Sequence, residues 1–302
     1  MGRSLKSKNK GVYVVNCFDF HLHSYFSDGR LSPQDLIRAC KENNLKTVAL
    51  TDHENVKGIP WAVSEGKKLG VKVVPGIEFA SEFEGEECHF LGLDIEYNSA
   101  ELAEFLKRWE GTKTRQIEEM VKGLDQLGFF LEFNEVATQA CGAINRAHIA
   151  YAVFDKPENK SVFERLNIYN SNDFFVRFLK ESSPVYVKRV LPKAIDVIGL
   201  IKRLKGWAIW AHPIWKNKDL ALTREKAAYF QRFGLDGMEV GYSKDYQSFE
   251  ETRVLHQIAG RLYLLETAGS DFHSYTIPIL NKIANFELMD IKLNLPKFSR
   301  ET

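Results

Sequence analysis

Histidines are scarce in this sequence, and most of them stand where predicted strands end. The chain has 8 histidines. Six of these lie at or just beyond the end of a predicted strand: His21, His23, His53, His89, His212 and His273. In α/β barrels, the groups that do chemistry are displayed at the carboxyl ends of the strands. These six histidines are therefore candidates for one shared functional site.

Two pairs of polar residues have a spacing that places both side chains on one face of a strand. His21 and His23 flank a single leucine, and side chains along a strand alternate faces with period two. Asp271 and His273 repeat this spacing near the other end of the chain. Neutral imidazoles and carboxylates are ligands for zinc, manganese and iron, so both pairs favour a metal site.

Two further carboxylates extend the pattern. Asp28 lies in a Ser-Asp-Gly turn that can fold back over the preceding strand end, and Glu78 closes the strand predicted at 71–79. Each feature alone has an ordinary explanation, since most isolated His-x-His pairs are incidental and a histidine in an apolar strand is usually part of the core. Six histidines and three carboxylates at successive strand ends are harder to attribute to accident. The whole set predicts a cluster of divalent metal ions.

Strands and helices alternate on both sides of a helical middle segment. Helices are expected at 33–42, 58–69, 220–233 and 244–259, and strands at 12–23, 46–52, 71–79, 88–95, 207–211, 237–240 and 263–268. Such βα repeats are typical of a parallel sheet or barrel. Residues 100–203 carry helical patterns and few strand signals, which predicts a helical insertion between two barrel strands.

Size and charge limit the class of protein. A chain of 302 residues is long enough for one large α/β domain with an insertion, and a hydrophobic content of 44% is ordinary for a folded protein. The formal net charge of +1 creates no global field toward long nucleic acid or an anionic membrane. Neither a P-loop nor a G-x-S-x-G elbow occurs, which excludes nucleotide hydrolysis by a P-loop and leaves a serine hydrolase without support.

The cysteines and the N-terminal segment bear on the compartment. The four cysteines (Cys17, Cys40, Cys88 and Cys141) form no C-x-x-C pair, so we expect them to be reduced. No apolar run reaches the ~18–20 residues that span a membrane. Residues 1–11 are basic but no apolar stretch follows them, so we expect a loose tail rather than a signal peptide. These features predict a cytoplasmic protein with no membrane segment.

Seven short motifs occur in a fixed order along the chain. They are Phe20-His21-Leu22-His23-Ser24, Ser27-Asp28-Gly29, Thr51-Asp52-His53, Pro75-Gly76-Ile77-Glu78, His89-Phe90-Leu91-Gly92, Ala211-His212-Pro213 and Gly269-Ser270-Asp271-Phe272-His273. Together they resemble the motifs of the PHP (polymerase and histidinol phosphatase) superfamily of metal-dependent phosphoesterases. The resemblance implies an α/β fold: a distorted seven-stranded (β/α) barrel at 12–99 and 204–302, with residues 100–203 as a helical insertion that caps the substrate.

The resemblance also implies three divalent metal ions, with Mn²⁺ expected and Fe²⁺ or Zn²⁺ as alternatives. By position, the first ion would be bound by His21, His23, Glu78 and Asp271, the second by Glu78, His89 and His212, and the third by Asp28, His53 and His273. Hydroxide between the first two ions would attack phosphorus, which gives Glu78 and Asp271 the catalytic positions. Asp52 is expected to orient a ligand imidazole.

A motif in the insertion bears on the substrate. Asn145-Arg146-Ala147-His148 is similar to the Gly-Arg-Pro-His of one branch, which contains nucleoside 3′,5′-bisphosphate phosphatases and 5′→3′ exonucleases acting on short RNA. Arg146 and His148 are therefore the predicted substrate-binding residues, Arg146 as a phosphate clamp. A surface salt bridge for Arg146 and helix packing for His148 remain alternatives. Lys188 and Arg189 could line the mouth of the cleft, but a solvated surface position is the stronger expectation for both.

Three functions remain open at this point. The first is hydrolysis of a nucleoside 3′,5′-bisphosphate or a short 5′-phosphorylated RNA, and the helical insertion favours it. The second is hydrolysis of a small phosphate ester such as histidinol phosphate, and the third is a non-catalytic metal-stabilised binding domain. The expected partner is a small nucleotide or short RNA rather than long duplex nucleic acid or a membrane, and the oligomeric state is not predicted.

Overall fold

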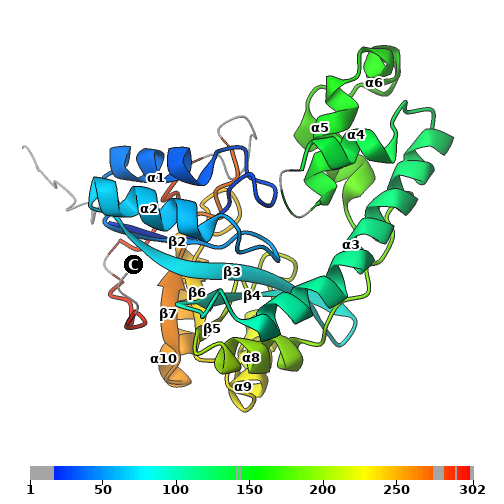
Figure 1. Ribbon diagram of the computed structural model, residues 1–302. Helices are drawn as coiled ribbons and strands as arrows, with labels where there is room; N and C mark the ends of the chain where they lie inside the picture. The colour runs from blue at the N-terminus through cyan, green and yellow to red at the C-terminus, as the bar shows by residue number, and fades with distance from the viewer. Residues whose placement is uncertain (1–16, 141, 143, 275–281, 290, 300–302) are drawn as a thin grey trace, which may run out of the picture.

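Seven strands, hydrogen-bonded in chain order, form a nearly closed barrel (Figure 1). The computed structural model describes residues 17–140, 142, 144–274, 282–289 and 291–299. The strands are β1 (Phe18–Leu22), β2 (Thr47–Leu50), β3 (Lys72–Phe83), β4 (Glu86–Leu93), β5 (Trp207–Trp210), β6 (Gly237–Gly241) and β7 (Leu265–Ala268). The predicted seven-stranded barrel is thus confirmed. Residues 12–16 of the first predicted strand and the tail before them lie outside the described residues.

One strand runs against the others. β4 is antiparallel to both β3 and β5, whereas the other neighbouring pairs are parallel. The βα repeats had predicted parallel strands, and that prediction is wrong for β4. Only Glu84 and Gly85 separate β3 from β4, both with positive φ, and such a two-residue turn makes a hairpin rather than a crossover. The beginning of β4, with His89, therefore meets the edge where the parallel strands end.

Contacts between the first and last strands bring the two ends of the chain together. Leu22 forms a parallel bridge with Phe272, and the His23 amide donates to the Phe272 carbonyl at 3.0 Å. Buried Asp19 accepts from the Ser270 amide at 3.0 Å. This seam places the segment after β7 directly beside the end of β1.

Helices on the outside of the barrel hold the strands in place. They are α1 (Pro33–Glu42), α2 (Ile59–Leu69), α8 (Ala194–Arg203), α9 (Leu220–Gln231) and α10 (Phe249–Arg261). The predicted start of α1 is confirmed, because the Ser32 side chain accepts from the Asp35 amide at 3.0 Å. α10 begins later than predicted, because Ser248 and Glu251 form a capping box at its first turn.

The helical segment has a hydrophobic core of its own. Its elements are α3 (Ala100–Gln126), α4 (Phe133–Thr138), α5 (Arg146–Asp155), η1 (Pro157–Asn159), α6 (Lys160–Leu166), α7 (Ser171–Phe174) and η2 (Phe175–Leu179). Buried side chains between Ile117 and Val185 pack together, and we call residues 117–187 the helical lobe (Figure 1). Leu102 at the start of α3 and Ile201 in α8 instead belong to the barrel core. The division proposed at residues 100 and 203 therefore gives the insertion two segments that pack on the barrel.

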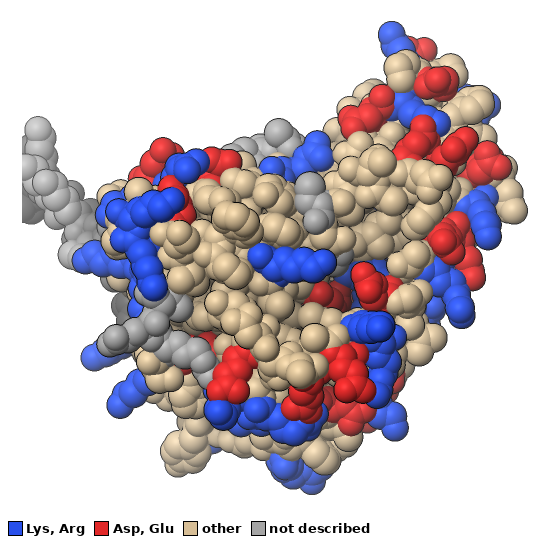
Figure 2. Space-filling view, in the orientation of Figure 1, with Lys and Arg blue, Asp and Glu red and all other residues tan. Residues whose placement is uncertain are grey.

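Surface properties of the described residues agree with the composition. Figure 2 shows acidic and basic side chains intermingled on this face rather than gathered by sign. Within the described ranges, none of the helices has the length and apolar composition needed to cross a bilayer. Cys17, Cys40 and Cys88 are free thiols, as predicted, and Cys141 lies outside the described residues.

We expect Asn159 to be a major determinant of the stability of the helical lobe. Its buried side chain accepts from the Phe130 amide at 2.7 Å and donates to the carbonyls of Phe130 and Val153 at 3.0 Å. Asn159→Ala leaves these backbone groups unpaired and should lower the free energy of unfolding by about 2 to 3 kcal/mol, measured by urea denaturation. Exposed Asn98→Ala is the control, and an equal effect of both variants would contradict the assignment.

Candidate metal centre

The nine residues predicted as metal ligands meet at one edge of the barrel. His21 lies in β1, Glu78 in β3 and His89 in β4. The other six lie in the segments that follow strands: His23 and Asp28 after β1, His53 after β2, His212 after β5, and Asp271 and His273 after β7. The chain therefore collects these side chains from most strands of the barrel, as the sequence pattern predicted. Their roles as ligands remain predictions.

Glu78 lies at the centre of the group. Its side chain is only 1% exposed, and nitrogens of five imidazoles approach its two carboxylate oxygens. The distances are 3.2 Å to His21 Nε2, 3.3 Å to His23 Nε2, 3.1 Å to His53 Nδ1, 2.8 Å to His89 Nδ1 and 3.1 Å to His212 Nε2. No other carboxylate in the described part of the chain meets so many histidines.

A first group of four possible ligands surrounds Glu78 and Asp271. Asp271 Oδ1 lies 2.9 Å from His23 Nε2 and 3.3 Å from His21 Nε2. One ligand atom from each of His21, His23, Glu78 and Asp271 lies within 4.8 Å of the others. This group has the same members as the first predicted ligand set.

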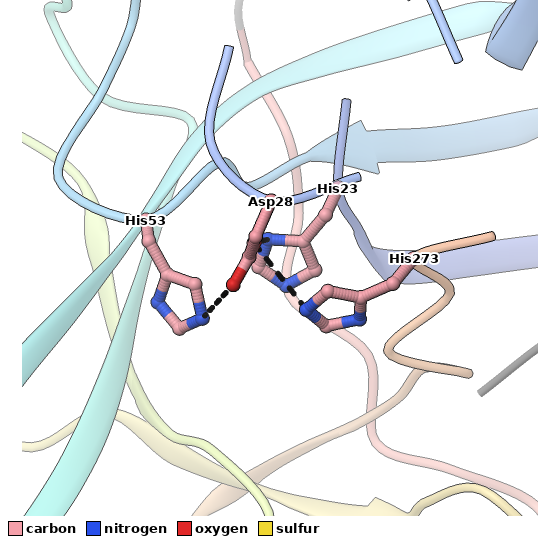
Figure 3. A group of neighbouring side chains, drawn as sticks. All are labelled: His23, Asp28, His53 and His273. Carbon is pink, nitrogen blue, oxygen red and sulfur yellow. Dashed lines mark ion pairs between the residues drawn. The ribbon is translucent and has the colours of Figure 1, made fainter. Parts of the chain in front are cut away.

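A second group surrounds Asp28, whose carboxylate faces three imidazoles (Figure 3). Asp28 lies 3.4 Å from His273 Nε2 and 3.8 Å from both His53 Nε2 and His23 Nδ1. The group contains the third predicted set together with His23. His23 therefore lies between two possible ion positions.

The third group differs in one member from the predicted set. His53, Glu78 and His89 can meet at one ion, whereas the resemblance implied Glu78 with His89 and His212. His212 is nevertheless close, since its Nε2 lies 3.1 Å from Glu78 Oε1. His53 and His212 both contact Glu78, and the ion to which each of them binds stays a prediction.

Unpaired buried atoms gather in the same place. In the described ranges, ten buried side-chain nitrogen or oxygen atoms have no hydrogen-bond partner, and six of them belong to the predicted ligands. These six are His21 Nε2, His23 Nε2, Asp28 Oδ1, Glu78 Oε2, His212 Nδ1 and Asp271 Oδ1. Each such atom costs about 1 to 3 kcal/mol unless something pairs with it. Four of them, His21 Nε2, His23 Nε2, Glu78 Oε2 and Asp271 Oδ1, face one another with nitrogen–oxygen distances of 2.9 to 3.3 Å, and this arrangement fits a divalent metal centre.

Two residues that the sequence pattern did not identify orient the ligands. His21 Nδ1 donates to buried Glu239 of β6 at 3.2 Å, which leaves Nε2 to face Glu78 and Asp271. The Tyr242 hydroxyl donates to Asp271 Oδ2 at 2.7 Å, which leaves Oδ1 to face His21 and His23. Such hydrogen bonds fix the orientation of metal ligands. A single glutamate within the apolar strand at 237–240 was the one available sequence signal.

Asp52, which we expected to orient a ligand, reaches the ligand His23 only through the Ser27 hydroxyl. It accepts hydrogen bonds from the hydroxyls of Ser24 at 2.7 Å and Ser27 at 2.6 Å. The Ser27 hydroxyl in turn lies 3.4 Å from His23 Nδ1. Burial raises the pKa of Asp52 to about 6, although these hydroxyls and His23 favour its charged form.

The charges of the cluster compensate one another through protonated imidazoles such as His23, whereas burial lowers the pKa of His53 to about 4. Burial raises the pKa of Glu78, but His53, His21 and His89 outweigh it and hold that pKa well below its usual range. Burial lowers the pKa of His23, but Asp271 and Glu78 outweigh it and raise that pKa to about 10. Divalent cations would replace these protons, so metal binding should release protons from the cluster.

A cavity of about 250 Å³ extends from the cluster to the helical lobe. Arg146 lines it, as expected for a substrate contact. Its guanidinium donates to the Leu179 carbonyl at 3.0 Å and packs over the rings of Phe175 and Tyr186. Among the described residues, no carboxylate forms a salt bridge with Arg146. These contacts do not support the surface salt bridge that was the alternative.

His148 is placed differently. It is 2% exposed and does not line the cavity. Its Nδ1 accepts the Asn145 amide at 2.9 Å, at the first turn of α5. Burial lowers the pKa of His148 to about 4, so the ring is neutral at pH 7. The structure therefore favours the alternative of helix packing over substrate contact.

A buried ion cluster on the cavity wall was not expected. Arg189 Nη2 donates to Glu54 Oε1 at 3.0 Å, and Lys113 of α3 pairs with the other oxygen. Glu54 directly follows His53, so this cluster ties α3 to the metal-centre edge of the barrel. Lys188 is exposed, as expected, whereas Arg189 follows the alternative and lines the cavity, where Glu54 holds it.

Comparisons with known proteins agree with this geometry. A model of the PHP domain family matches residues 19–176. A 5′-3′ exoribonuclease of Haemophilus influenzae is 27% identical over 85% of this chain and 89% of its own length. A 3′,5′-nucleoside bisphosphate phosphatase of Chromobacterium violaceum is also 27% identical, over 85% of this chain and 87% of its own.

Solved structures resemble the whole fold. One from Bifidobacterium adolescentis, described as a candidate metal-dependent phosphoesterase, is 25% identical with a TM-score of 0.77 and covers 90% of this chain and 92% of its own. An amidohydrolase from Chromobacterium violaceum is 24% identical with a TM-score of 0.78 and covers 94% of this chain and 93% of its own. The second supports the fold alone.

Divalent metal should stabilise the native protein through this cluster. At a Mn²⁺ concentration about 100 times the dissociation constant, binding contributes about 2.7 kcal/mol and should raise the melting temperature of metal-free protein by about 5 °C or more. Glu78→Ala should remove most of the shift, because it takes away the carboxylate shared by two of the three groups. The control is exposed Glu104→Ala, which should keep the shift; a full shift in Glu78→Ala would contradict the assignment.

Proposed function

Since the chain belongs to the PHP domain family, we propose that it is a metal-dependent phosphoesterase acting on nucleotides. The proposed substrates are a nucleoside 3′,5′-bisphosphate, such as adenosine 3′,5′-bisphosphate, and short 5′-phosphorylated RNA degraded from its 5′ end. As predicted, the enzyme class is a hydrolase of phosphoric ester bonds, in agreement with the names of the relatives. The observation that carries the proposal is the buried Glu78 carboxylate facing five imidazoles beside a cavity lined by Arg146.

The nine predicted residues would hold three divalent ions, for which we propose manganese. When bound, such ions neutralise the charge of a phosphate and lower the pKa of water enough to supply hydroxide at neutral pH. The protein contributes the geometry. Glu239 and Tyr242 orient His21 and Asp271, which keeps His21 Nε2 and Asp271 Oδ1 turned toward the centre. A cytoplasmic location is proposed as well.

Arg146 is proposed to bind a phosphate oxygen of the substrate. Its planar guanidinium presents several donors, and the Leu179 carbonyl holds one of them at 3.0 Å. Packing on Phe175 and Tyr186 limits the motion of the side chain. A cation held in this way on the wall of the same cavity as the cluster is suited to bind an anionic group of the substrate.

The two alternatives gain no support from the relatives. Histidinol phosphate is a small amine-bearing ester, whereas this cavity has aromatic walls and extends to a separate helical lobe. A non-catalytic binding domain has no need of an open cavity beside a complete set of nine ligands. Neither alternative has an observation of its own in its favour.

A comparison of three substrates tests the proposal. With added Mn²⁺, we expect phosphate or nucleotide release from adenosine 3′,5′-bisphosphate and from a 5′-phosphorylated oligoribonucleotide, and far slower release from histidinol phosphate. Glu78→Ala should abolish activity while its far-ultraviolet circular dichroism stays native. Silence of the wild type on all three substrates would favour the binding domain.

Arg146→Ala should weaken substrate binding more than turnover. Loss of a charge-assisted hydrogen bond corresponds to about a 10- to 100-fold rise in KM for adenosine 3′,5′-bisphosphate, with kcat nearly unchanged. Arg146→Lys keeps the charge without the planar fork and should give an intermediate KM. Arg177→Ala, also in the lobe but away from the cavity, is the control. An unchanged KM in Arg146→Ala would rule out the phosphate contact.

A further inference from the structure

An exposed tryptophan stands next to the metal centre. Trp215 lies three residues beyond His212 and lines the same cavity. Its ring centroid lies 5.4 Å from that of His212 and 5.7 Å from that of His89. The side chain is 37% exposed, although the indole is the largest apolar group that a protein can bury. An indole held against two predicted metal ligands with one part open to the cavity is placed to contact a ligand.

The helical lobe supplies a second aromatic ring. Phe175, the first residue of η2, lines the same cavity. The Arg146 guanidinium packs over the Phe175 ring, 5.7 Å from the ring centroid. Tyr246 from the barrel also lines the cavity and stacks near Tyr242. Aromatic surface therefore reaches the cavity from both the barrel and the lobe.

An ion pair connects the loop that carries Trp215 with the lobe segment that carries Phe175. Lys216, next to Trp215, pairs with Glu181, two residues beyond the end of η2. The Lys216 ammonium also lies 4.9 Å from the Trp215 ring centroid and 3.5 Å from Glu87. These contacts tie the loop after β5 to the lobe segment that carries Phe175. The two rings therefore lie on segments that this ion pair joins.

The cavity thus has walls of two chemical kinds. One is the cluster of imidazoles and carboxylates, which suits a phosphate once metals are bound. The other consists of aromatic rings, with Trp215 beside that cluster and Phe175 on the lobe. Ser171 and Asn172 line the same cavity and can form hydrogen bonds with polar groups at the edge of a ring. A molecule that carries both a phosphate and a flat heteroaromatic ring matches both kinds of wall.

We propose that Trp215 and Phe175 form a stacking subsite for the base of the nucleotide whose phosphate reaches the metal centre. This inference rests on the proposed function and adds the specificity-determining residues to it. Base stacking tolerates any sequence because every base has a π-face.

Kinetics on substrates with and without a base test the subsite. Trp215→Ala should lower kcat/KM for adenosine 3′,5′-bisphosphate about tenfold or more, mainly through KM, and should change that for ribose 5-phosphate less than about twofold. Phe175→Ala should act in the same direction, and Trp215→Phe should restore most of the loss. The matched control is Trp61→Ala, an exposed tryptophan in α2. Equal losses on both substrates would show a structural role for the loop and overturn the inference.

Tryptophan fluorescence tests the same subsite without any turnover. Adenosine carries no phosphate, so its binding does not require hydrolysis or metal. We expect adenosine to quench the fluorescence of the wild type and of Trp61→Phe, and the quench to disappear in Trp215→Phe. Quenching without phosphatase activity would uphold the subsite and reject the proposed function. Hydrolysis of adenosine 3′,5′-bisphosphate without a quench that depends on Trp215 would uphold the proposed function and reject the subsite.

Discussion

A buried carboxylate surrounded by imidazoles is the interaction on which this structure depends. Glu78 is 1% exposed, and five histidine nitrogens lie within 3.3 Å of its oxygens. A charge removed from water must be compensated locally, and several protonated imidazoles around one carboxylate repel each other. Divalent cations resolve this conflict, because they pair with the carboxylates and bind the neutral rings at the same time. The unpaired atoms of the cluster identify where such ions would be bound.

The barrel is arranged to deliver ligands to that carboxylate. The seam between β1 and the segment after β7 joins His21 and His23 to Asp271, although they stand at opposite ends of the chain. The reversal of β4 brings His89 to the same edge from the beginning of its strand rather than from its end. Glu239 and Tyr242 then fix the rotation of their partners. The order of the strands, the direction of β4 and the hydrogen bonds from Glu239 and Tyr242 all contribute to the placement of the ligands in one cluster.

Much of this centre could be predicted from the sequence because strand periodicity is local. The one-residue separation of His21 and His23 is enough to place that pair on one face. Asp271 and His273 instead lie beyond the end of β7, and Asp271 has a positive φ, so strand periodicity does not explain how this second pair is placed. The antiparallel β4 could also have been predicted, since Glu84-Gly85 is a hairpin turn.

The remaining features depend on contacts between residues far apart in the chain. Glu239 contacts His21 across the barrel, and an ion pair with Glu54 keeps the Arg189 side chain mostly buried. For His148, the contacts favour the second of the two predicted roles, helix packing. Its position in a family motif suggested a substrate contact, but its ring nitrogen accepts the Asn145 amide at the start of a helix. Spacing along the chain carries no information on such pairings until the fold is known.

Anomalous scattering from crystals of the Mn²⁺-loaded protein with bound adenosine 5′-monophosphate tests the central claim most directly. We expect three manganese peaks, one beside His21 and His23, one beside His89 and one beside Asp28. The first two peaks should flank Glu78, and the phosphate of the nucleotide should lie next to these two peaks. A single peak, or peaks that do not contact Glu78, would contradict the account.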